Sequence, residues 1–241
     1  MGQIKTNAIV LSRADYREND RMLTLFSPTL GRVDALARRA KSQKSPLLAA
    51  SELFCSGEYV LYATRDRATV ESCHITDTFF PLRESYERFS HGIYLLELCR
   101  HVVQPGEENE RLFLFLLRSL AHLAYGTSEP KSVTAIFIMG LLSLTGYRPR
   151  VTRCISCGEP IGTVPGGYAI STAEAGILCA NCKRAEPSIE ERDAEAMQRI
   201  MRLGLKTLDE GLEISDSAFH ALLAMARERL DGTFQSEKAL I

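Results

Sequence analysis

The hydrophobic pattern of this 241-residue chain changes its period near Phe80 and Pro81. Before that point, short runs with partial alternation or β-rich composition are separated by charged and turn-forming clusters, which is typical of strands. After it, apolar residues recur every three or four positions, as in helices that bury one face. The sequence therefore predicts an α+β protein with a β domain at residues 1–80 and a helical domain at residues 81–241.

Five short strands are predicted in the first part of the chain. They cover residues 4–11, 21–26, 32–37, 58–63 and 69–75. Five strands in so few residues predict a small closed barrel, for which the OB-fold is the obvious five-stranded candidate. Periodicity alone leaves an SH3-like barrel open as the alternative.

Five helices are predicted in the second part. Ser188 and Glu191 are placed to form a capping box at the start of the fourth helix, and Gly146 is placed to end the third. The first helix begins near Tyr86 and the second covers residues 108–125. The third follows Pro130 and runs through Leu144, the fourth carries Met197 to Leu203, and the fifth covers Asp216–Leu230.

Two Cys-x-x-Cys pairs stand out among the seven cysteines. Cys154 and Cys157 form the first pair, Cys179 and Cys182 form the second, and 21 residues lie between the pairs. Two residues between cysteines let both thiolates of a tight turn face one ion, and two such turns complete a closed tetrahedral shell. The spacing predicts one structural zinc ion in an insertion at residues 150–185. A redox pair, disulfides and an iron–sulfur cluster are the less favoured alternatives.

Positive charge gathers locally, although the net charge of the chain is only −1. Cationic side chains neutralise phosphates and bind nucleic acid without reading its sequence. We therefore expect a nucleic-acid-binding groove on the barrel, and a solvated face without a ligand is the alternative. The candidate residues are Arg13, Arg17, Arg21, Arg32, Arg38, Arg39, Lys41 and Lys44.

Four aromatic residues of the same region are available to stack on unpaired bases. They are Tyr16, Phe26, Tyr59 and Tyr62. Burial in the barrel core is the alternative, and the pattern favours it.

The chain shows no recognisable catalytic constellation. The five histidines are dispersed, and there is neither a Walker loop nor a Gly-x-Gly-x-x-Gly motif. The N-terminus has no apolar signal region, and an odd cysteine count with two metal-binding pairs fits a reducing compartment. We expect a cytoplasmic protein that is not an enzyme.

Several sequence runs are familiar when they are read together. Residues 10–27 read VLSRADYRENDRMLTLFS and residues 31–45 read GRVDALARRAKSQKS. Leu144 opens the run LTGY, and residues 176–182 read GILCANC. In this order, across nearly the whole chain, they resemble the bacterial recombination mediator family RecO.

That resemblance implies an N-terminal OB-fold domain that binds DNA, a helical domain and an inserted structural zinc knuckle. It implies binding of single- and double-stranded DNA, annealing of complementary strands and a nucleoid-associated location in bacteria. With RecR, such a protein helps RecA to replace single-stranded-DNA-binding protein in gap and double-strand-break repair. The resemblance implies neither binding to a membrane nor a small-molecule substrate.

The family resemblance also implies contact with the C-terminal tail of single-stranded-DNA-binding protein. That tail is acidic with an apolar end, so we expect a groove with an apolar floor and a basic rim. Arginines of the helical domain are the candidates for the rim: Arg100, Arg111, Arg118 and Arg148.

The chain departs from the family pattern in two basic loops. Arg17 and Arg39 stand where glycine is common, and Ser42 replaces a basic residue. Because glycine takes positive φ at little cost and arginine does not, we expect these loops to differ in shape. DNA contact transfers to Arg38 and Lys41 more directly than to Arg39 and Lys44.

Three other functions compete with a DNA-binding mediator. An RNA-binding module with structural zinc is the main alternative, since barrels and zinc knuckles also serve RNA. A metal-dependent hydrolase would need an open coordination position, and an interaction scaffold would lack affinity for nucleic acid.

Overall fold

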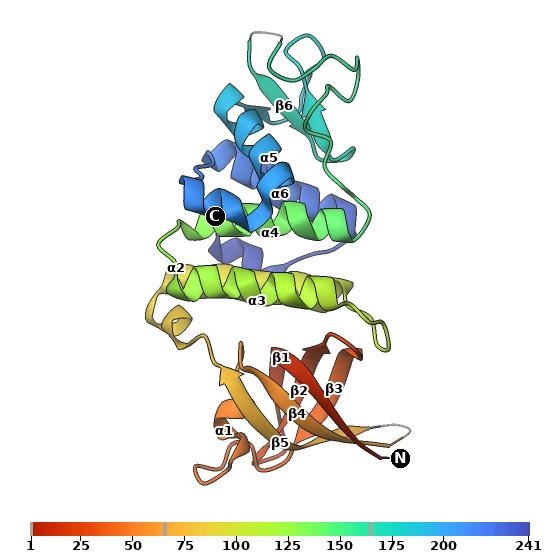
Figure 1. Cartoon of the computed structure of the whole chain (residues 1–241), viewed down its shortest axis with the longest axis vertical. Helices are drawn as coiled ribbons and strands as arrows, with labels where there is room; N and C mark the ends of the chain where they lie inside the picture. Colours follow the sequence, from red (N-terminus) through yellow and green to blue (C-terminus); the bar gives the residue numbers. More distant parts are fainter. Residues whose placement is uncertain (1, 65–66, 164–165) are drawn as a thin grey trace. The chain divides into compact units, whose positions relative to one another are not determined.

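The computed structural model describes residues 2–64, 67–163 and 166–241, without the side chains of residues 209 and 210. The chain folds as two compact units, Met1–Ala124 and Tyr125–Ile241. Figure 1 colours the strands of the first unit red to orange and the helices of the second unit green to blue. None of the described helices combines the length and the apolar character that crossing a bilayer requires.

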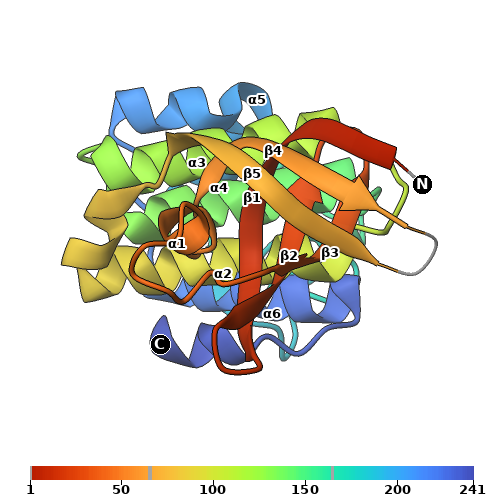
Figure 2. The ribbon, with the colours of Figure 1, turned by 90° about the horizontal axis from the view of Figure 1, so that it is seen from below.

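The described strands of the first unit close into a five-stranded barrel in the order β1-β2-β3-β5-β4. β1 pairs with both β2 and β4, and a short parallel contact between β3 and β5 completes the closure (Figure 2). This order confirms the predicted OB-fold over an SH3-like barrel. The strands are β1 (Gly2–Tyr16), β2 (Asp20–Ser27), β3 (Gly31–Ala37), β4 (Ser56–Ala63) and β5 (Ala68–Asp77).

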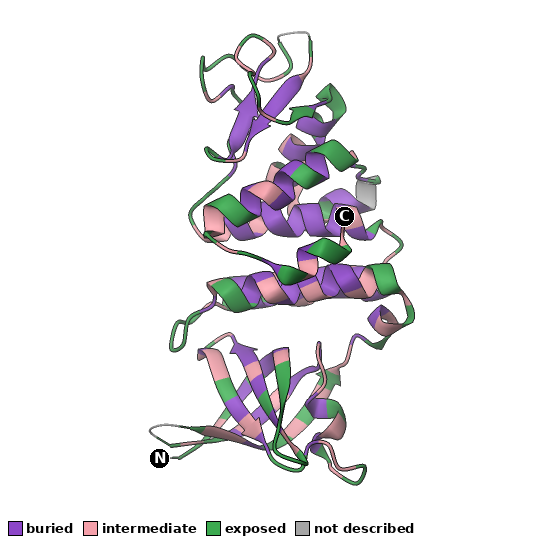
Figure 3. Ribbon diagram, turned by 180° about the vertical axis from the view of Figure 1, so that it is seen from behind, coloured by how far each residue is buried: buried purple, intermediate pink, exposed green. Residues whose placement is uncertain are grey.

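The barrel interior is filled by apolar side chains from alternate strand positions. Leu23, Leu25 and Leu61 are almost completely buried, and each such leucine contributes about 1.5–3 kcal/mol through removal of its surface from water. The short helix α1 (Leu47–Ala50) covers one end of the core, where the Tyr59 hydroxyl donates to the Ala50 carbonyl at 2.6 Å. Figure 3 shows the mixture of buried and exposed positions along these strands.

Two helices complete the first unit: α2 (Tyr86–Val102) and α3 (Glu110–Tyr125), which follow a 3-10 turn, η1 (Phe80–Glu84). α2 packs against β1, and Phe113 of α3 meets Phe26 of the barrel edge-to-face, with ring centroids 5.4 Å apart. Gly31 has a φ of +64°, and a side chain there would collide with the Gln104 carbonyl, which accepts from the Arg32 amide. Because both helices pack on the barrel, the compact unit extends beyond the predicted domain boundary at residue 80.

The second unit is built around α4 (Pro130–Leu144), which is buried on most sides (Figure 3). It packs against α5 (Glu191–Leu203) and α6 (Asp216–Leu230). Two 3-10 helices, η2 (Gly204–Glu210) and η3 (Gln235–Ala239), complete the helical part. The predicted end of the third helix agrees with α4, which includes Pro130 as its first residue, and the predicted bounds of the fifth helix agree with α6.

The predicted capping box at the start of α5 is wrong in its position. Glu190 caps the helix, and its own amide donates to the Asp193 carboxylate at 3.1 Å. Ser188 cannot take this role because it lies in β8, where it pairs with Ala169. Asp193 is buried and also accepts from the amide and hydroxyl of Ser215, so it joins the starts of α5 and α6.

A small antiparallel sheet lies between α4 and α5 in sequence, and the periodicity did not predict it. Its strands have the order β7-β6-β8. They are β6 (Tyr168–Ser171), β7 (Gly176–Leu178) and β8 (Ser188–Ile189). Strands of two to four residues are too short to show alternation.

Candidate metal centre and nucleic-acid surface

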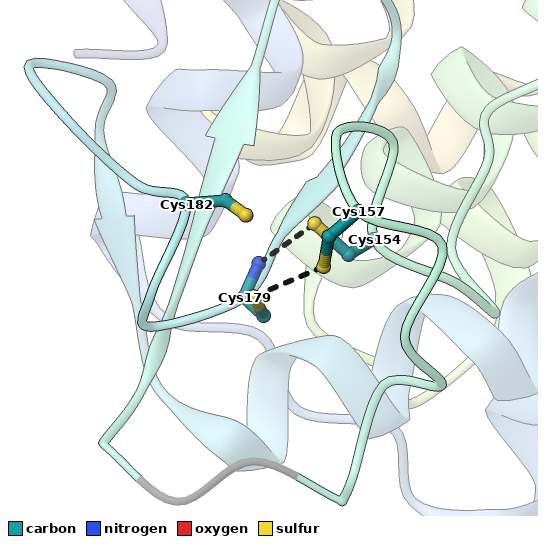
Figure 4. A group of neighbouring side chains, drawn as sticks. All are labelled: Cys154, Cys157, Cys179 and Cys182. Atoms are coloured by element: carbon teal, nitrogen blue, oxygen red, sulfur yellow. Dashed lines mark hydrogen bonds between the residues drawn. The ribbon is translucent and has the colours of Figure 1, made fainter.

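The four predicted zinc ligands converge in the second unit. Cys154 and Cys157 come from the loop that follows α4, whereas Cys179 and Cys182 follow β7 directly. Figure 4 shows the two pairs facing each other across a small space. All four sulfur atoms lie within 4.8 Å of one another.

Backbone hydrogen bonds hold the two cysteine turns together. The Arg150 amide donates to Ala175, and the Ile177 amide donates back to Arg150 at 3.0 Å. The Ile155 amide then donates to Ile177 at 3.0 Å, so the first turn lies along β7. A side chain at Gly176 would collide with Ile155, which explains why glycine stands at this close approach.

The environment of Cys154 favours a thiolate. Burial opposes the charge, but amides of Cys157, Cys179 and Ser156 donate to its sulfur and lower the pKa of the Cys154 thiol to about 6. The Cys179 amide lies 3.4 Å from this sulfur (Figure 4). At Cys157 the Glu159 amide favours the thiolate, but the neighbouring sulfurs outweigh it and raise the pKa to about 12. Because several thiolates in close contact repel one another, they do not all ionise readily by themselves. A bound cation would neutralise this charge and favour the ionised sulfurs.

The sulfur geometry fits a tetrahedral ion. Zinc–sulfur bonds of about 2.3 Å place the sulfurs of a tetrahedral site about 3.8 Å apart, and the sulfurs of Cys157 and Cys179 are 3.7 Å apart. Among the described residues, this is the one group of three or more potential ligands that gathers in this way. Cys55, Cys73 and Cys99 lie elsewhere, in the first unit. The cluster can hold a metal ion.

Most of the predicted DNA-binding residues lie near one end of the barrel. The turn between β1 and β2 is joined to the loop after β3, because the Arg39 amide donates to the Asp20 carboxylate at 2.8 Å and the Lys41 amide donates to the Asn19 carbonyl at 3.0 Å. Arg32 is not part of this group. It lies at the other end of β3, opposite Phe26.

Three of these cations are held by carboxylates that sequence reasoning missed. Arg13 and Arg21 both reach Glu52, at 2.7 and 2.8 Å, and Lys41 reaches Asp15 at 2.8 Å. Arg21 is buried and also donates to the Ser51 hydroxyl. No local spacing links Arg13 or Arg21 to Glu52, so only the folded barrel shows these pairs.

Four other cations are exposed near the same loops, and none of them forms an ion pair with a described carboxylate. They are Arg17, Arg38, Arg39 and Lys44. We refer to these four residues together with Lys41 as the basic loop surface. Arg17 and Arg39 have φ values of 55° and 54°. Both arginines thus adopt the left-handed conformation that glycine takes at little cost, so the reason given for a different loop shape does not hold at these two positions.

The aromatic candidates divide into two pairs. Phe26 and Tyr59 are completely buried, which confirms the core interpretation for them. Tyr16 and Tyr62 are 38% and 42% exposed. The guanidinium of Arg17 lies over the ring of Tyr16, 5.2 Å from its centroid, so Tyr16 adjoins the basic loop surface.

The arginines predicted to meet an acidic tail fall on different elements. Arg100 lies on α2 beside Glu97, and Arg148 follows α4 in the second unit. Arg111 and Arg118 lie on α3, three residues before and four residues after Leu114, so all three share one helix face. Leu114 is 41% exposed. An apolar side chain between two exposed arginines is therefore present on α3.

Comparisons with known proteins identify the family. The family model described as "Recombination protein O N terminal" matches residues 1–79, and "Recombination protein O C terminal" matches residues 83–236. "DNA repair protein RecO" of Acetivibrio thermocellus is 31% identical, over 97% of this chain and 94% of the relative. The protein of the same name from Alkaliphilus metalliredigens is 35% identical, over 74% of this chain and 72% of the relative. The chain belongs to the RecO family of DNA repair proteins.

Proposed function

We propose that this protein is a DNA-binding recombination mediator. It binds single- and double-stranded DNA, anneals complementary strands and, with RecR, helps RecA to replace single-stranded-DNA-binding protein in gap and double-strand-break repair. Membership in the RecO family supports this role, and we assign no catalytic step to it. The observation that carries the proposal is the basic loop surface at one end of an OB-fold barrel.

The basic loop surface suits the phosphate backbone rather than the bases. Arg38, Arg39 and Lys44 are exposed, and no described carboxylate forms an ion pair with them, so their charge is available to a strand. Exposed guanidinium and ammonium groups release counterions from DNA and give binding that weakens with salt. Arg21 is buried and donates to Ser51 and Glu52, so its proposed role is to stabilise the fold beneath the basic loop surface without contacting DNA.

Zinc is the metal that we propose for the cysteine cluster. The sulfur spacing fits zinc–thiolate bonds, and Cys₄ is a common donor set of structural zinc sites. A shell closed by four protein sulfurs leaves no position for a substrate water, so the ion would stabilise the inserted segment without taking part in chemistry.

The exposed face of α3 is our proposed site for the tail of single-stranded-DNA-binding protein. Leu114 offers an apolar contact, and Arg111 and Arg118 stand beside it to meet carboxylates. This arrangement matches the expected apolar floor with a basic rim. A pull-down with coating protein that retains or lacks its last residues tests this assignment, with Leu114→Ala expected to weaken capture.

The DNA assignment is tested by a double variant, Arg38→Ala with Arg39→Gly. Removing two phosphate contacts should reduce the slope of log affinity against log salt by about 1.4 for a single strand. Because glycine suits the positive φ at position 39, a loss of binding could not be attributed to strain at that position. Affinity and slope equal to those of the wild type would sink the assignment. Competition by RNA of matched length separates the mediator from an RNA-binding module.

A further inference from the structure

A cavity of about 700 Å³ lies beside the cysteine cluster in the second unit. Its wall consists of the segment 148–158 and of Met201 from α5. Arg148, Arg150 and Arg153 line it, and the described lining includes no carboxylate. The lining of the cavity therefore brings three arginines together.

Residues 148–151 alternate in burial as an extended segment does. Pro149 and Val151 are buried, whereas Arg148 and Arg150 are exposed, and this alternation is that of a strand. A residue before proline favours extended backbone, and Arg150 bridges to Gly176. The stems of Arg148 and Arg150 thus leave the same side of the chain about 7 Å apart. A stretched phosphodiester backbone can match such a spacing.

An exposed aromatic ring stands next to these arginines. Tyr147 immediately precedes Arg148 and is 45% exposed, and the guanidinium of Arg229 lies 5.6 Å from the centroid of its ring. A ring flanked by cations is a platform on which an unpaired base can stack. A peptide that carries only acidic side chains would use the charges and leave the ring without a contact, so the ring beside the arginines favours a single strand of nucleic acid.

The existing partners of the arginines leave room for a ligand. Arg150 meets Glu174 at 3.3 Å in a pair with both side chains more than half exposed, and pairs of this kind contribute little. Arg153 uses one nitrogen to donate to the Gly158 carbonyl.

We propose that Tyr147, Arg148, Arg150 and Arg153 form a second site for single-stranded nucleic acid, with phosphates on the arginines and a base on the tyrosine. The inference rests on the proposed function, since the chain must bind nucleic acid, and goes beyond it, since this site lies outside the barrel. A chain with two strand sites can hold two strands, as annealing requires.

The test compares two double variants that lose the same charge within the second unit. Arg148→Ala with Arg150→Ala removes the paired cations of the site, and Arg184→Ala with Arg192→Ala is the control, because both control residues are exposed and lie outside the cavity lining. Anisotropy of a labelled oligothymidylate is measured across a salt series. We expect the site variant to lower the salt slope by about 1.4 and the control to leave it unchanged. Tyr147→Ala should weaken binding about tenfold, and Tyr147→Phe should restore it.

The outcomes distinguish the second site from the barrel surface. If the site variant behaves like the control while Arg38→Ala with Arg39→Gly loses affinity, the second site is wrong and the barrel assignment stands. If the wild-type protein does not bind the oligonucleotide even at low salt, both the barrel assignment and the second site are wrong. If the site variant binds the oligonucleotide normally but loses an aspartate-rich peptide, the cavity serves an acidic protein segment and the inference is overturned. Unchanged metal content in every variant shows that the cysteine segment is still folded.

Discussion

The barrel and the segment at residues 150–185 are stabilised in different ways. The barrel buries side chains such as Leu25, Leu61 and Tyr59 almost completely, whereas the segment has strands of two to four residues around four clustered sulfurs. Burial of apolar surface acts over the whole barrel. A metal ion would act at one point, so that loss of one ligand has a large local effect. The two regions should therefore respond to different substitutions.

Cys154→Ser should have the largest effect. Cys154 is a buried member of the cluster, and its sulfur accepts from the Cys179 amide. The folding free energy linked to metal binding at four-cysteine sites is on the order of 10 kcal/mol. We expect loss of bound zinc and rapid proteolysis within residues 150–185, with the barrel still folded. Inductively coupled plasma mass spectrometry and limited proteolysis measure both. Cys73→Ser is the control, since Cys73 lies outside the cluster; stoichiometric zinc in the Cys154 variant would refute the site.

Leu25→Ala should produce the reverse pattern. Leu25 is completely buried in the barrel, and removing a buried leucine side chain costs about 2–5 kcal/mol. Chemical denaturation should report this loss for the first unit while zinc content stays at the wild-type level. Met22→Ala, at a partly exposed position on the same strand, should cost far less. Loss of zinc in the Leu25 variant would show that the regions are not independent.

Arg39→Gly should stabilise the barrel while weakening its binding to DNA. The φ of 54° costs arginine about 1–2 kcal/mol and glycine almost nothing. The free energy of unfolding should rise by about 1 kcal/mol, and the salt slope for a single strand should fall by about 0.7. Arg38→Gly is the matched comparison, because Arg38 is not among the residues with positive φ. It should lower the slope and also lower stability; a stability gain in both variants would contradict the strain argument.

Long elements and short-range motifs were predictable from the sequence. α4 ends where predicted and begins at Pro130 itself, because proline suits a first helical turn. α6 begins where Ser215 accepts from the Ala218 amide. The cysteine cluster was predictable because each Cys-x-x-Cys pair defines its own turn. Folding then needs to bring only two turns together.

Features that depend on distant partners were not predictable. Glu52 is 39 residues from Arg13 and 31 from Arg21, yet it holds both. The sequence shows eight cations that are candidates for DNA binding. Only the fold shows which of these cations form ion pairs with carboxylates. The sheet of β6, β7 and β8 escaped prediction because its strands are too short for a period. The left-handed conformation of the two arginines was not predicted because the backbone preference of a residue type is an average over many environments. Here the Asp20 carboxylate accepts from the Arg39 amide and holds that one residue directly.

The smallest predicted effect concerns the carboxylate that holds Lys41. The hydrogen bond from Lys41 keeps the pKa of Asp15 below its ordinary value, so Asp15 is charged at neutral pH. This contribution to stability is present above about pH 4 and is lost as the pH falls through the lowered pKa. Asp15→Asn removes the charge and releases the ammonium group to the basic loop surface.

Affinity of Asp15→Asn for a single strand should therefore increase, with a salt slope steeper by about 0.7, or one further phosphate contact. Asp34→Asn is the control, because Asp34 is an exposed acid that accepts from Thr24 and forms no ion pair with a described cation. If both variants gain equally, net charge alone governs binding. If only the Asp15 variant gains, the strength of the basic loop surface is set by which cations the barrel's own acids restrain, and the number of cations in the sequence is a poor guide to affinity.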